Sequence, residues 1–258
     1  MTIGSFVRPV WADFADAKNA AIGLKTLQSS RRQSPMDFRI ISIGTLSRHE
    51  LWGESAATRT AHATTTLIRS GDRVILVDPG LPPQILQARL TERCGLQPGD
   101  ITDVFMTNFR PAHRWGLSAF PQANWLVSEM ERETTGRYLI ARLDQEQEEE
   151  AAELIRQDIQ QLQRCQPASD RLADQVDLFP LPGFTTGTCG LLLSHLNATT
   201  LIAGDAAGTY EHLVQGRVLQ GCVDAEQGQE SLREVIEIAD VIVPGHDNLL
   251  LNPTRRPM

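Results

Sequence analysis

The segment HATTTLIRSGDRVILVDPG, residues 62–80, carries the clearest structural pattern in this sequence. Polar and apolar residues alternate along TTTLI, a Ser-Gly-Asp turn follows at residues 70–72, and VILV is an uninterrupted apolar run. Alternation is typical of a strand with one buried face, whereas a short apolar run is typical of a strand buried on both faces. The segment therefore predicts a β-hairpin whose second strand lies inside a sheet.

Further strands are predicted on both sides of this hairpin, at residues 38–47, 100–108, 124–129, 176–183, 190–206 and 240–245. Helices are predicted at residues 82–95, where Gly95 ends the pattern, and at 231–239. Residues 129–166 are rich in Glu, Gln and Arg with apolar residues at helical spacing, which predicts one or two exposed helices. The strands fall into two groups with helices between them, which favours an α/β protein with two sheets and outer helices.

The chain divides into two predicted regions. Residues 1–36 are interpreted as an N-terminal extension, with a short helix near residues 11–27 and a polar stretch behind it. Residues 37–258 are predicted to form one domain, with a helical insertion at about residues 129–166. The extension is interpreted as a packing arm for this domain.

Composition narrows the classes of partner. The net charge of −8 over 258 residues argues against nucleic acid, because phosphate binding requires a basic face. No segment approaches the roughly 18 uninterrupted apolar residues of a membrane span, and the charged N-terminus lacks the apolar core of a signal peptide. The four cysteines are far apart in the sequence, which is typical of reduced thiols. We therefore expect a cytoplasmic protein that binds neither nucleic acid nor membranes.

Four polar residues follow the carboxyl ends of predicted strands: Asp78, His113, Asp205 and His246. Loops at this edge of a sheet are a common place for chemistry. Two imidazoles and one carboxylate are a sufficient ligand set for a catalytic zinc ion, and the same set holds non-haem iron.

Each of these residues, taken singly, is more often structural. An aspartate at a strand end commonly forms a turn or a helix cap, and a lone histidine is commonly a hydrogen-bonded core residue. The other histidines, at positions 49, 62, 195 and 212, have no comparable context and are interpreted as structural.

Several blocks, in order, resemble the metallo-β-lactamase fold hydrolases. They are the hairpin at 64–80, ITDVFMTNFRPAHRWGLSAFP at 101–121, FPLPGFTTGTCGLLL at 179–193, LIAGD at 201–205 and VIVPGHD at 241–247. The resemblance covers residue 38 to the C-terminus. It implies an αββα sandwich of two mixed β-sheets with helices on the outer faces, and a metal site at one edge where the two halves meet.

The family's His-x-His-x-Asp-His motif is degenerate in this sequence. Its six positions correspond to residues 108–113, so Asn108, Arg110 and Ala112 replace two histidines and the aspartate, and the last histidine is retained. The histidine of the family's Pro-Gly-His-Thr turn is replaced by Phe184. The resemblance therefore implies that the first metal site of the family is lost.

The second metal site of the family is partly retained. His113, Asp205 and His246 match three of its ligands, and only the aspartate at the Ala112 position is missing. The expected cofactor is one divalent metal ion, with zinc as the first candidate and iron or manganese as alternatives, and the absence of any metal is left open. Asp205 is the candidate catalytic base, because the carboxylate that the family uses for this purpose is absent.

Arg110 and Phe184 argue against a metal. A guanidinium repels a nearby dication, and an aromatic ring occupies a position where a metal ligand would be expected. Arg110 could instead take part in catalysis or bind a carboxylate or phosphate by paired hydrogen bonds, or it could pair internally with Asp205 or Asp78. Trp115 is interpreted either as a substrate-binding residue at the mouth of the pocket or as part of the core.

Two functions are therefore left open. The favoured one is a metallo-β-lactamase-like hydrolase with a single metal, acting on an unidentified small molecule. The alternative is a catalytically inactive member of the fold that binds a small anionic ligand or a protein partner through Arg110 and the remnant pocket. A homodimer is compatible with either function.

Overall fold

The hairpin predicted at residues 62–80 forms the interior of the first sheet in the computed structural model, which describes residues 36–254. β2 (Thr65–Ser70) and β3 (Arg73–Val77) are antiparallel, and Ser70 pairs with Arg73 across the turn. Gly71 in this turn has a φ of 58°, a left-handed conformation that glycine adopts without steric cost. The hairpin prediction is confirmed.

The first sheet contains six strands in sequence order, β1 to β6. Besides the hairpin strands β2 and β3, they are β1 (Asp37–Ser42), β4 (Asp103–Phe105), β5 (Asn124–Val127) and β6 (Gln166–Pro167). β1 pairs with β2 in antiparallel orientation, whereas β3 to β6 run parallel to one another. Because β3 and β4 are parallel neighbours, the loops that follow them leave the same edge of the sheet.

The second sheet is formed by the second half of the chain, in the order β12-β11-β10-β9-β8-β7. Its strands are β7 (Arg171–Ala173), β8 (Val176–Pro180), β9 (Cys189–Ser194), β10 (Thr199–Gly204), β11 (Val241–Pro244) and β12 (Leu250–Leu251). β10 and β11 are parallel, and the other pairs are antiparallel. The predicted division of the strands into two groups is confirmed, and both sheets are mixed.

The helices predicted at residues 82–95, 129–166 and 231–239 are present with differences at their ends, and the structure adds shorter helices that were not predicted. They are α2 (Pro83–Cys94), α3 (Pro111–Arg114), α4 (Glu129–Gln145), α5 (Glu149–Arg164), α6 (Tyr210–Gln215) and α7 (Ala225–Ile238), with short 3-10 helices at Glu50–Trp52, Pro98–Asp100 and Leu117–Ala119. α7 begins before the predicted residue 231, because the Asp224 carboxylate caps its first turn by accepting from the Gln227 backbone N–H at 3.0 Å. None of the helices among residues 36–254 is long and apolar enough to cross a membrane.

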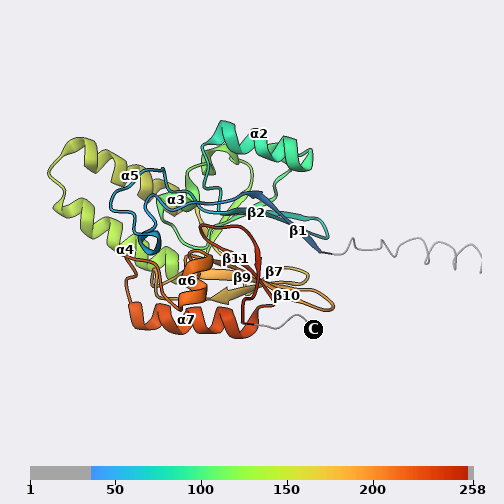
Figure 1. Ribbon diagram of the computed structural model, residues 1–258. Coiled ribbons are helices and arrows are strands. Elements are labelled where there is room, and N and C mark those ends of the chain that lie inside the picture. Colours follow the sequence, from blue (N-terminus) through green and yellow to red (C-terminus); the bar gives the residue numbers. More distant parts are fainter. Residues whose placement is uncertain (1–35, 255–258) are drawn as a thin grey trace, which may run out of the picture. The chain divides into compact units, whose positions relative to one another are not determined.

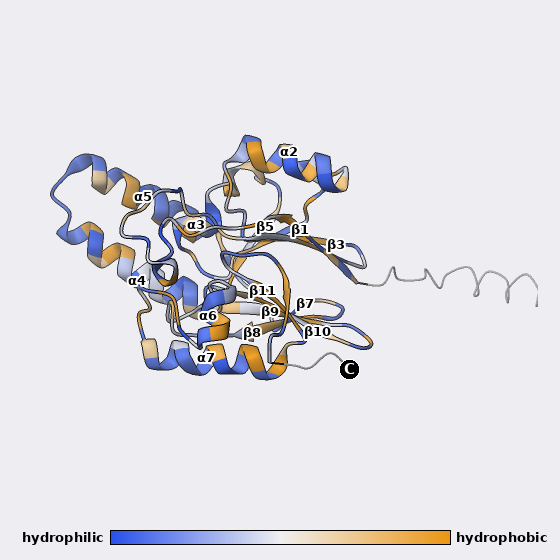
Figure 2. Cartoon of the chain, in the orientation of Figure 1, coloured by the Kyte–Doolittle hydropathy of each residue, from blue (hydrophilic) through white to orange (hydrophobic). Residues whose placement is uncertain are grey.

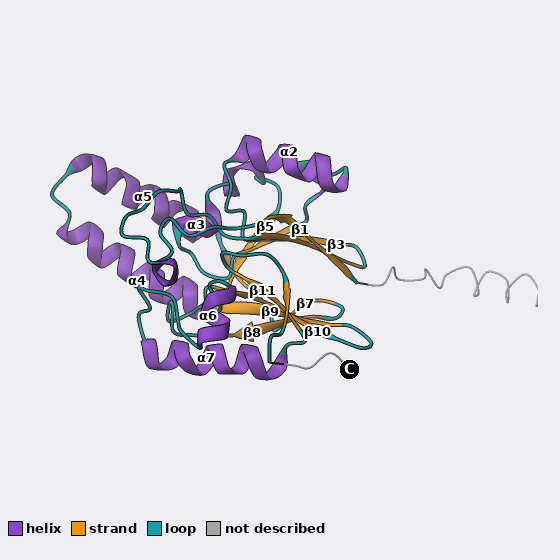
Figure 3. Ribbon diagram, viewed as in Figure 1, coloured by secondary structure: helices purple, strands orange, loops and turns teal. Residues whose placement is uncertain are grey.

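Figure 1 shows the two sheets face to face, with α2 over the outer face of the first sheet and α7 over the outer face of the second. Figure 3 separates the same layers by secondary structure. The buried core between the sheets draws on both of them, for example through Ile75 and Phe105 on one side and Leu191 and Val243 on the other. The predicted αββα sandwich is confirmed.

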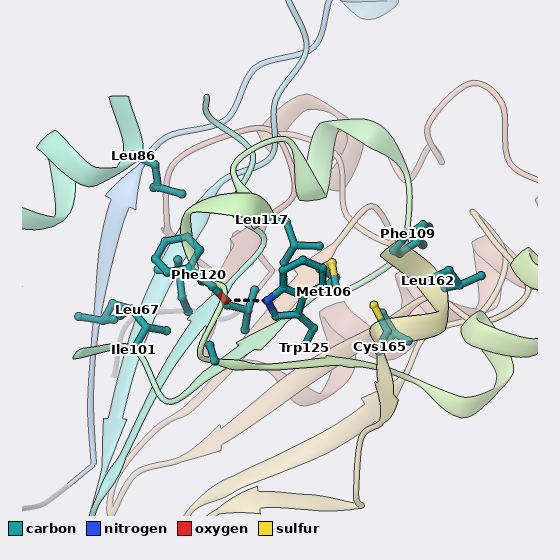
Figure 4. Close-up of a cluster of buried hydrophobic side chains, with 14 of the residues drawn as sticks. Leu67, Leu86, Ile101, Met106, Phe109, Leu117, Phe120, Trp125, Leu162 and Cys165 are labelled. Carbon is teal, nitrogen blue, oxygen red and sulfur yellow. Dashed lines mark hydrogen bonds between the residues drawn. The ribbon is translucent and has the colours of Figure 1, made fainter. Parts of the chain in front are cut away.

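A further core lies between each sheet and the helices on its outer face. In the core beneath α2, the Trp125 indole N–H donates to the Phe120 carbonyl at 2.9 Å, so the polar atom of this large side chain is satisfied (Figure 4). Leu232 and Val235 of α7 pack on the second sheet, and Figure 2 shows the mixture of polar and apolar residues along this helix. The rigid sandwich holds the loops at its edge.

The predicted N-terminal extension and its helix near residues 11–27 lie outside the described residues. The chain divides into two units, residues 1–34 and residues 35–258. All structural statements below concern the second unit.

Candidate functional site

Three of the residues that follow strand ends meet at one edge of the sandwich. Nitrogen atoms of His113 and His246 and an oxygen atom of Asp205 all lie within 4.8 Å of one another, and all three side chains are buried. His113 lies in α3, the short helix after β4, whereas Asp205 directly follows β10 and His246 is the second residue after β11, its parallel neighbour. The two sheets therefore each contribute to one cluster.

The Asp205 carboxylate lies between the two imidazoles. Its Oδ2 atom is 2.8 Å from His113 Nε2, and its Oδ1 atom is 2.9 Å from His246 Nε2. The contact with His246 lacks hydrogen-bond geometry, so Oδ1 is a buried oxygen without a hydrogen bond among residues 36–254. A buried polar atom in this state is costly unless another group completes its coordination.

The outer nitrogen of each imidazole is held by an acceptor. His246 Nδ1 lies 3.0 Å from the His62 carbonyl oxygen, and His113 Nδ1 lies 3.1 Å from Asp78 Oδ2. Carbonyl and carboxylate oxygens only accept, so both Nδ1 atoms carry hydrogen. With Nδ1 held by an acceptor, Nε2 of each ring faces Asp205, and a metal ion would replace the hydrogen between Nε2 and this carboxylate, which is the orientation of metal-ligating histidines. The residues fit a divalent metal ion.

The same contacts control the protonation of the cluster. Burial alone would lower the pKa of His113, but the Asp205 and Asp78 carboxylates on its two sides outweigh burial and raise that pKa well above its usual value. Burial alone would raise the pKa of Asp205, but His113 and His246 outweigh it and hold that pKa well below its usual value. A cation that displaces the proton from this cluster would be stabilised by the same carboxylates.

Asp78 has a role that its position at a strand end did not reveal. Its Oδ1 accepts from the Thr107 backbone N–H, and its Oδ2 accepts from the Thr107 hydroxyl, both at 2.8 Å. Asp78 itself has a φ of 50°, which is unusual for a residue other than glycine. Asp78 is therefore a positioning residue that fixes the ring of His113.

The positions that depart from the family motif are integrated into the fold. The Asn108 amide donates to Asp205 Oδ2 at 2.9 Å, and its carbonyl oxygen accepts from the Arg110 backbone N–H at 3.0 Å. Ala112 places a methyl group in the wall of the cavity beside the cluster, where the family has a carboxylate. Neither residue leaves a polar group of its own without a partner.

Arg110 does not form the internal ion pair that was one of the alternatives. Its guanidinium lies over the Phe184 ring, 5.6 Å from the ring centroid. Among residues 36–254 it forms no salt bridge, with Asp205, Asp78 or any other carboxylate. Its charge is therefore available to a ligand.

An open cavity of about 510 Å³ lies over the cluster. Its lining includes Asp205, His246, Arg110, Phe184, Glu50 and His212. This volume is in the range of small-molecule sites. Trp115 is 49% exposed and does not line this cavity, so the structure places it neither in the core nor at the mouth.

His212 and His49 form a second buried pair beside the cavity. Their rings lie 5.4 Å apart, and both have a nitrogen within 3.0 Å of the Thr209 hydroxyl. No strand end or spacing distinguishes these histidines in the sequence, which therefore indicates no role for them. Burial and the neighbouring His49 lower the pKa of His212 to about 4, and Glu211 offsets only part of this shift.

The lowered pKa of His212 predicts loss of stability in mild acid. The usual pKa is 6.5, so between about pH 6.5 and pH 4 the unfolded chain binds a proton at this residue that the folded chain excludes. The free energy of unfolding should fall as the pH drops through this window, by about 3 kcal/mol for this residue alone. Denaturant titrations at a series of pH values should show a shallower fall in His212→Gln. An equal fall in both proteins would contradict the prediction.

The fold has known relatives among solved structures. A metallo-β-lactamase from Thermotoga maritima superimposes with a TM-score of 0.62 at 22% sequence identity, covering 84% of this chain and 99% of that one. AidC, a dizinc quorum-quenching lactonase solved with N-hexanoyl-L-homoserine, gives 0.61 at 17% identity, covering 76% of each chain. An N-acyl homoserine lactone hydrolase gives 0.56 at 18% identity, covering 82% of this chain and 92% of that one.

The sequence itself carries the family signature despite the altered motif. No curated protein sequence matches the chain. The family model of the metallo-β-lactamase superfamily matches residues 59–246, a span that includes the hairpin, the degenerate motif and the three converging residues. With this match and the observed αββα sandwich, the chain belongs to the metallo-β-lactamase superfamily.

Proposed function

We propose that this protein is a hydrolase with a single divalent metal held by His113, Asp205 and His246. One observation carries the proposal: both imidazoles have Nδ1 bound to an acceptor, and both direct Nε2 at Asp205. Two imidazoles and one carboxylate fit zinc, and they also fit iron or manganese. A bound metal ion would supply Lewis acidity, which polarises a carbonyl or phosphoryl oxygen and acidifies water.

The protein residues have separate tasks in this proposal. Asp205 contacts both imidazoles, and it is the proposed proton acceptor because Ala112 carries no carboxylate. Arg110 lies at the cavity wall without a carboxylate partner among the described residues, so it can bind an anionic substrate group or negative charge that develops during reaction. The Phe184 ring packs against this guanidinium and forms an apolar part of the cavity wall.

The substrate is proposed to be a small molecule that the cavity of about 510 Å³ can enclose. Because lactonases are among the structural neighbours, N-acyl homoserine lactones belong in a first substrate screen together with other esters and phosphoesters. A cytoplasmic location and a homodimer are further parts of the proposal. They are tested by fractionation and by light scattering.

The free charge of Arg110 supports one alternative function. In that alternative the protein is inactive and binds a small anion through Arg110 in the same cavity. The two functions differ in their need for metal, so metal content separates them.

Protein purified without chelators or affinity metal should contain about one zinc, iron or manganese ion per chain. The double variant His113→Ala, His246→Ala should lose this metal, because only Asp205 would remain of the three ligands. His195→Ala is a matched control, since His195 lies in the turn at the opposite end of β10 from Asp205. Elemental analysis of the three proteins makes the measurement.

A chain that holds no metal even after incubation with excess zinc would refute the single-metal hydrolase. Metal retained by the double variant would equally refute the assignment of the ligands. In the first case, binding of phosphate or citrate that is lost in Arg110→Gln would support the inactive alternative.

A further inference from the structure

A buried hydrogen-bond network lies beside the cavity, outside the proposed metal ligands. Its centre is the Thr209 hydroxyl, which donates to Glu211 Oε2 at 2.9 Å. The same oxygen lies 3.0 Å from His49 Nε2 and 2.8 Å from His212 Nδ1. Thr209 and both histidines are buried. Burying these polar groups costs desolvation energy, and the network is stable in one geometry only when every hydrogen has an acceptor.

The hydrogens of this network can be assigned. A hydroxyl has a single hydrogen, and the Glu211 carboxylate, which only accepts, takes it. His212 Nδ1 therefore donates to Thr209 Oγ1, and His49 Nε2 donates either to the same oxygen or to Glu211 Oε2, 3.3 Å away. His49 Nδ1 is accordingly bare, and it is a buried atom without a partner among residues 36–254. Neutral His212 consequently has a bare Nε2.

The bare Nε2 of His212 faces a second acceptor. Glu50 Oε1 lies 3.9 Å away, and both residues line the cavity of about 510 Å³. Among residues 36–254, no hydrogen bond satisfies either atom. Burial and His49 keep the pKa of His212 at about 4, so this imidazole stays neutral near pH 7. Two facing acceptors repel each other unless a donor with at least two hydrogens lies between them.

We propose that His212 Nε2 and the Glu50 carboxylate form a binding site for a primary ammonium or amine group of the molecule that occupies this cavity. A carboxylate favours a cationic donor over a neutral one, and an ammonium group has enough hydrogens for both acceptors. Arg110 lines the same cavity and has no carboxylate partner among the described residues, so a ligand with an ammonium and an anionic group would satisfy both walls. Arg48 also lines the cavity, and its guanidinium donates a hydrogen bond to the Gln220 side-chain oxygen.

The site does not depend on a bound metal, so it is tested separately from the proposed hydrolase. The full chain, labelled with ¹⁵N and ¹³C in its histidines, is titrated with n-propylammonium chloride and, in parallel, with tetramethylammonium chloride. Tetramethylammonium has the same charge but no N–H. We expect a bare Nε2 in free His212, and a saturable shift of its ring resonances with n-propylammonium alone.

Variants show whether Glu50 is the second acceptor. Glu50→Gln should weaken n-propylammonium binding about tenfold or more, because it replaces a charged acceptor by a neutral one. Glu226→Gln makes the same change on the exposed first turn of α7, outside the cavity lining, and should bind as the unmodified chain does.

Three results would overturn the inference: a protonated Nε2 in free His212, equal shifts with both cations, or unchanged affinity in Glu50→Gln. The titration is repeated on the His113→Ala, His246→Ala variant, whose metal content is measured in parallel. Ammonium binding retained there shows that the site stands whether or not the chain is a metalloenzyme. If the unmodified chain binds n-propylammonium and this double variant does not, the site depends on the metal cluster and the inference is wrong.

Discussion

Replacing Asp205 by alanine should remove the bound metal and lower the free energy of unfolding of the metal-depleted protein by about 3–5 kcal/mol. The loss is large because the buried carboxylate contacts three polar groups at once: Asn108 Nδ2 at 2.9 Å, His113 Nε2 at 2.8 Å and His246 Nε2 at 2.9 Å. Without it, the buried His113 imidazole keeps only one of the two carboxylates that favour its charged form. Elemental analysis and denaturant titration at pH 7 measure the two effects.

The matched control is Asp144→Ala, which removes an exposed carboxylate from α4. It should change the free energy of unfolding by no more than about 0.5 kcal/mol and leave the metal content unchanged. The prediction is wrong if Asp205→Ala resembles this control. The isosteric change Asp205→Asn separates charge from shape, because the amide keeps one oxygen acceptor but cannot neutralise His113.

A second metal ion should bind when the family motif is restored at its four altered positions. The variant combines Asn108→His, Arg110→His, Ala112→Asp and Phe184→His, and it should contain about two metal ions per chain in place of one. The changes remove the two features that oppose a metal, the guanidinium of Arg110 and the ring that it covers at 5.6 Å. They also add the ligand types that the degenerate motif lacks.

One intermediate variant shows which changes matter. Phe184→His with Arg110→His replaces only the stacked pair at the cavity wall, and it should leave the metal content near one ion per chain. Adding Asn108→His and Ala112→Asp should supply the rest of the site. Metal content and circular dichroism are measured together, and a folded four-residue variant that still binds a single ion would refute the prediction.

The degenerate motif determines more about chemistry than about folding. Asn108 keeps a hydrogen bond to Asp205 in place of the histidine that the family has there, and Phe184 provides a surface for Arg110. The substituted residues therefore make contacts of their own at this edge.

The sequence by itself determined the fold of the second unit. The turn at residues 70–72, the apolar run at 74–77 and the strand-end positions of His113, Asp205 and His246 are local patterns. Local patterns report which face of an element is buried, because side chains repeat every two residues in a strand and every 3.6 residues in a helix. The resemblance then placed three strand-end residues in one site, and the structure brings the same three together.

Only the tertiary structure decided how these residues are held and what surrounds them. The pairing of Asp78 with His113, the free guanidinium of Arg110 and the network centred on Thr209 left no pattern in the sequence. His49 and Thr209 are 160 residues apart, yet their side chains meet at 3.0 Å. Such contacts depend on how the two sheets, one from each half of the chain, pack against each other. Residue spacing along one strand or helix carries no information about that packing.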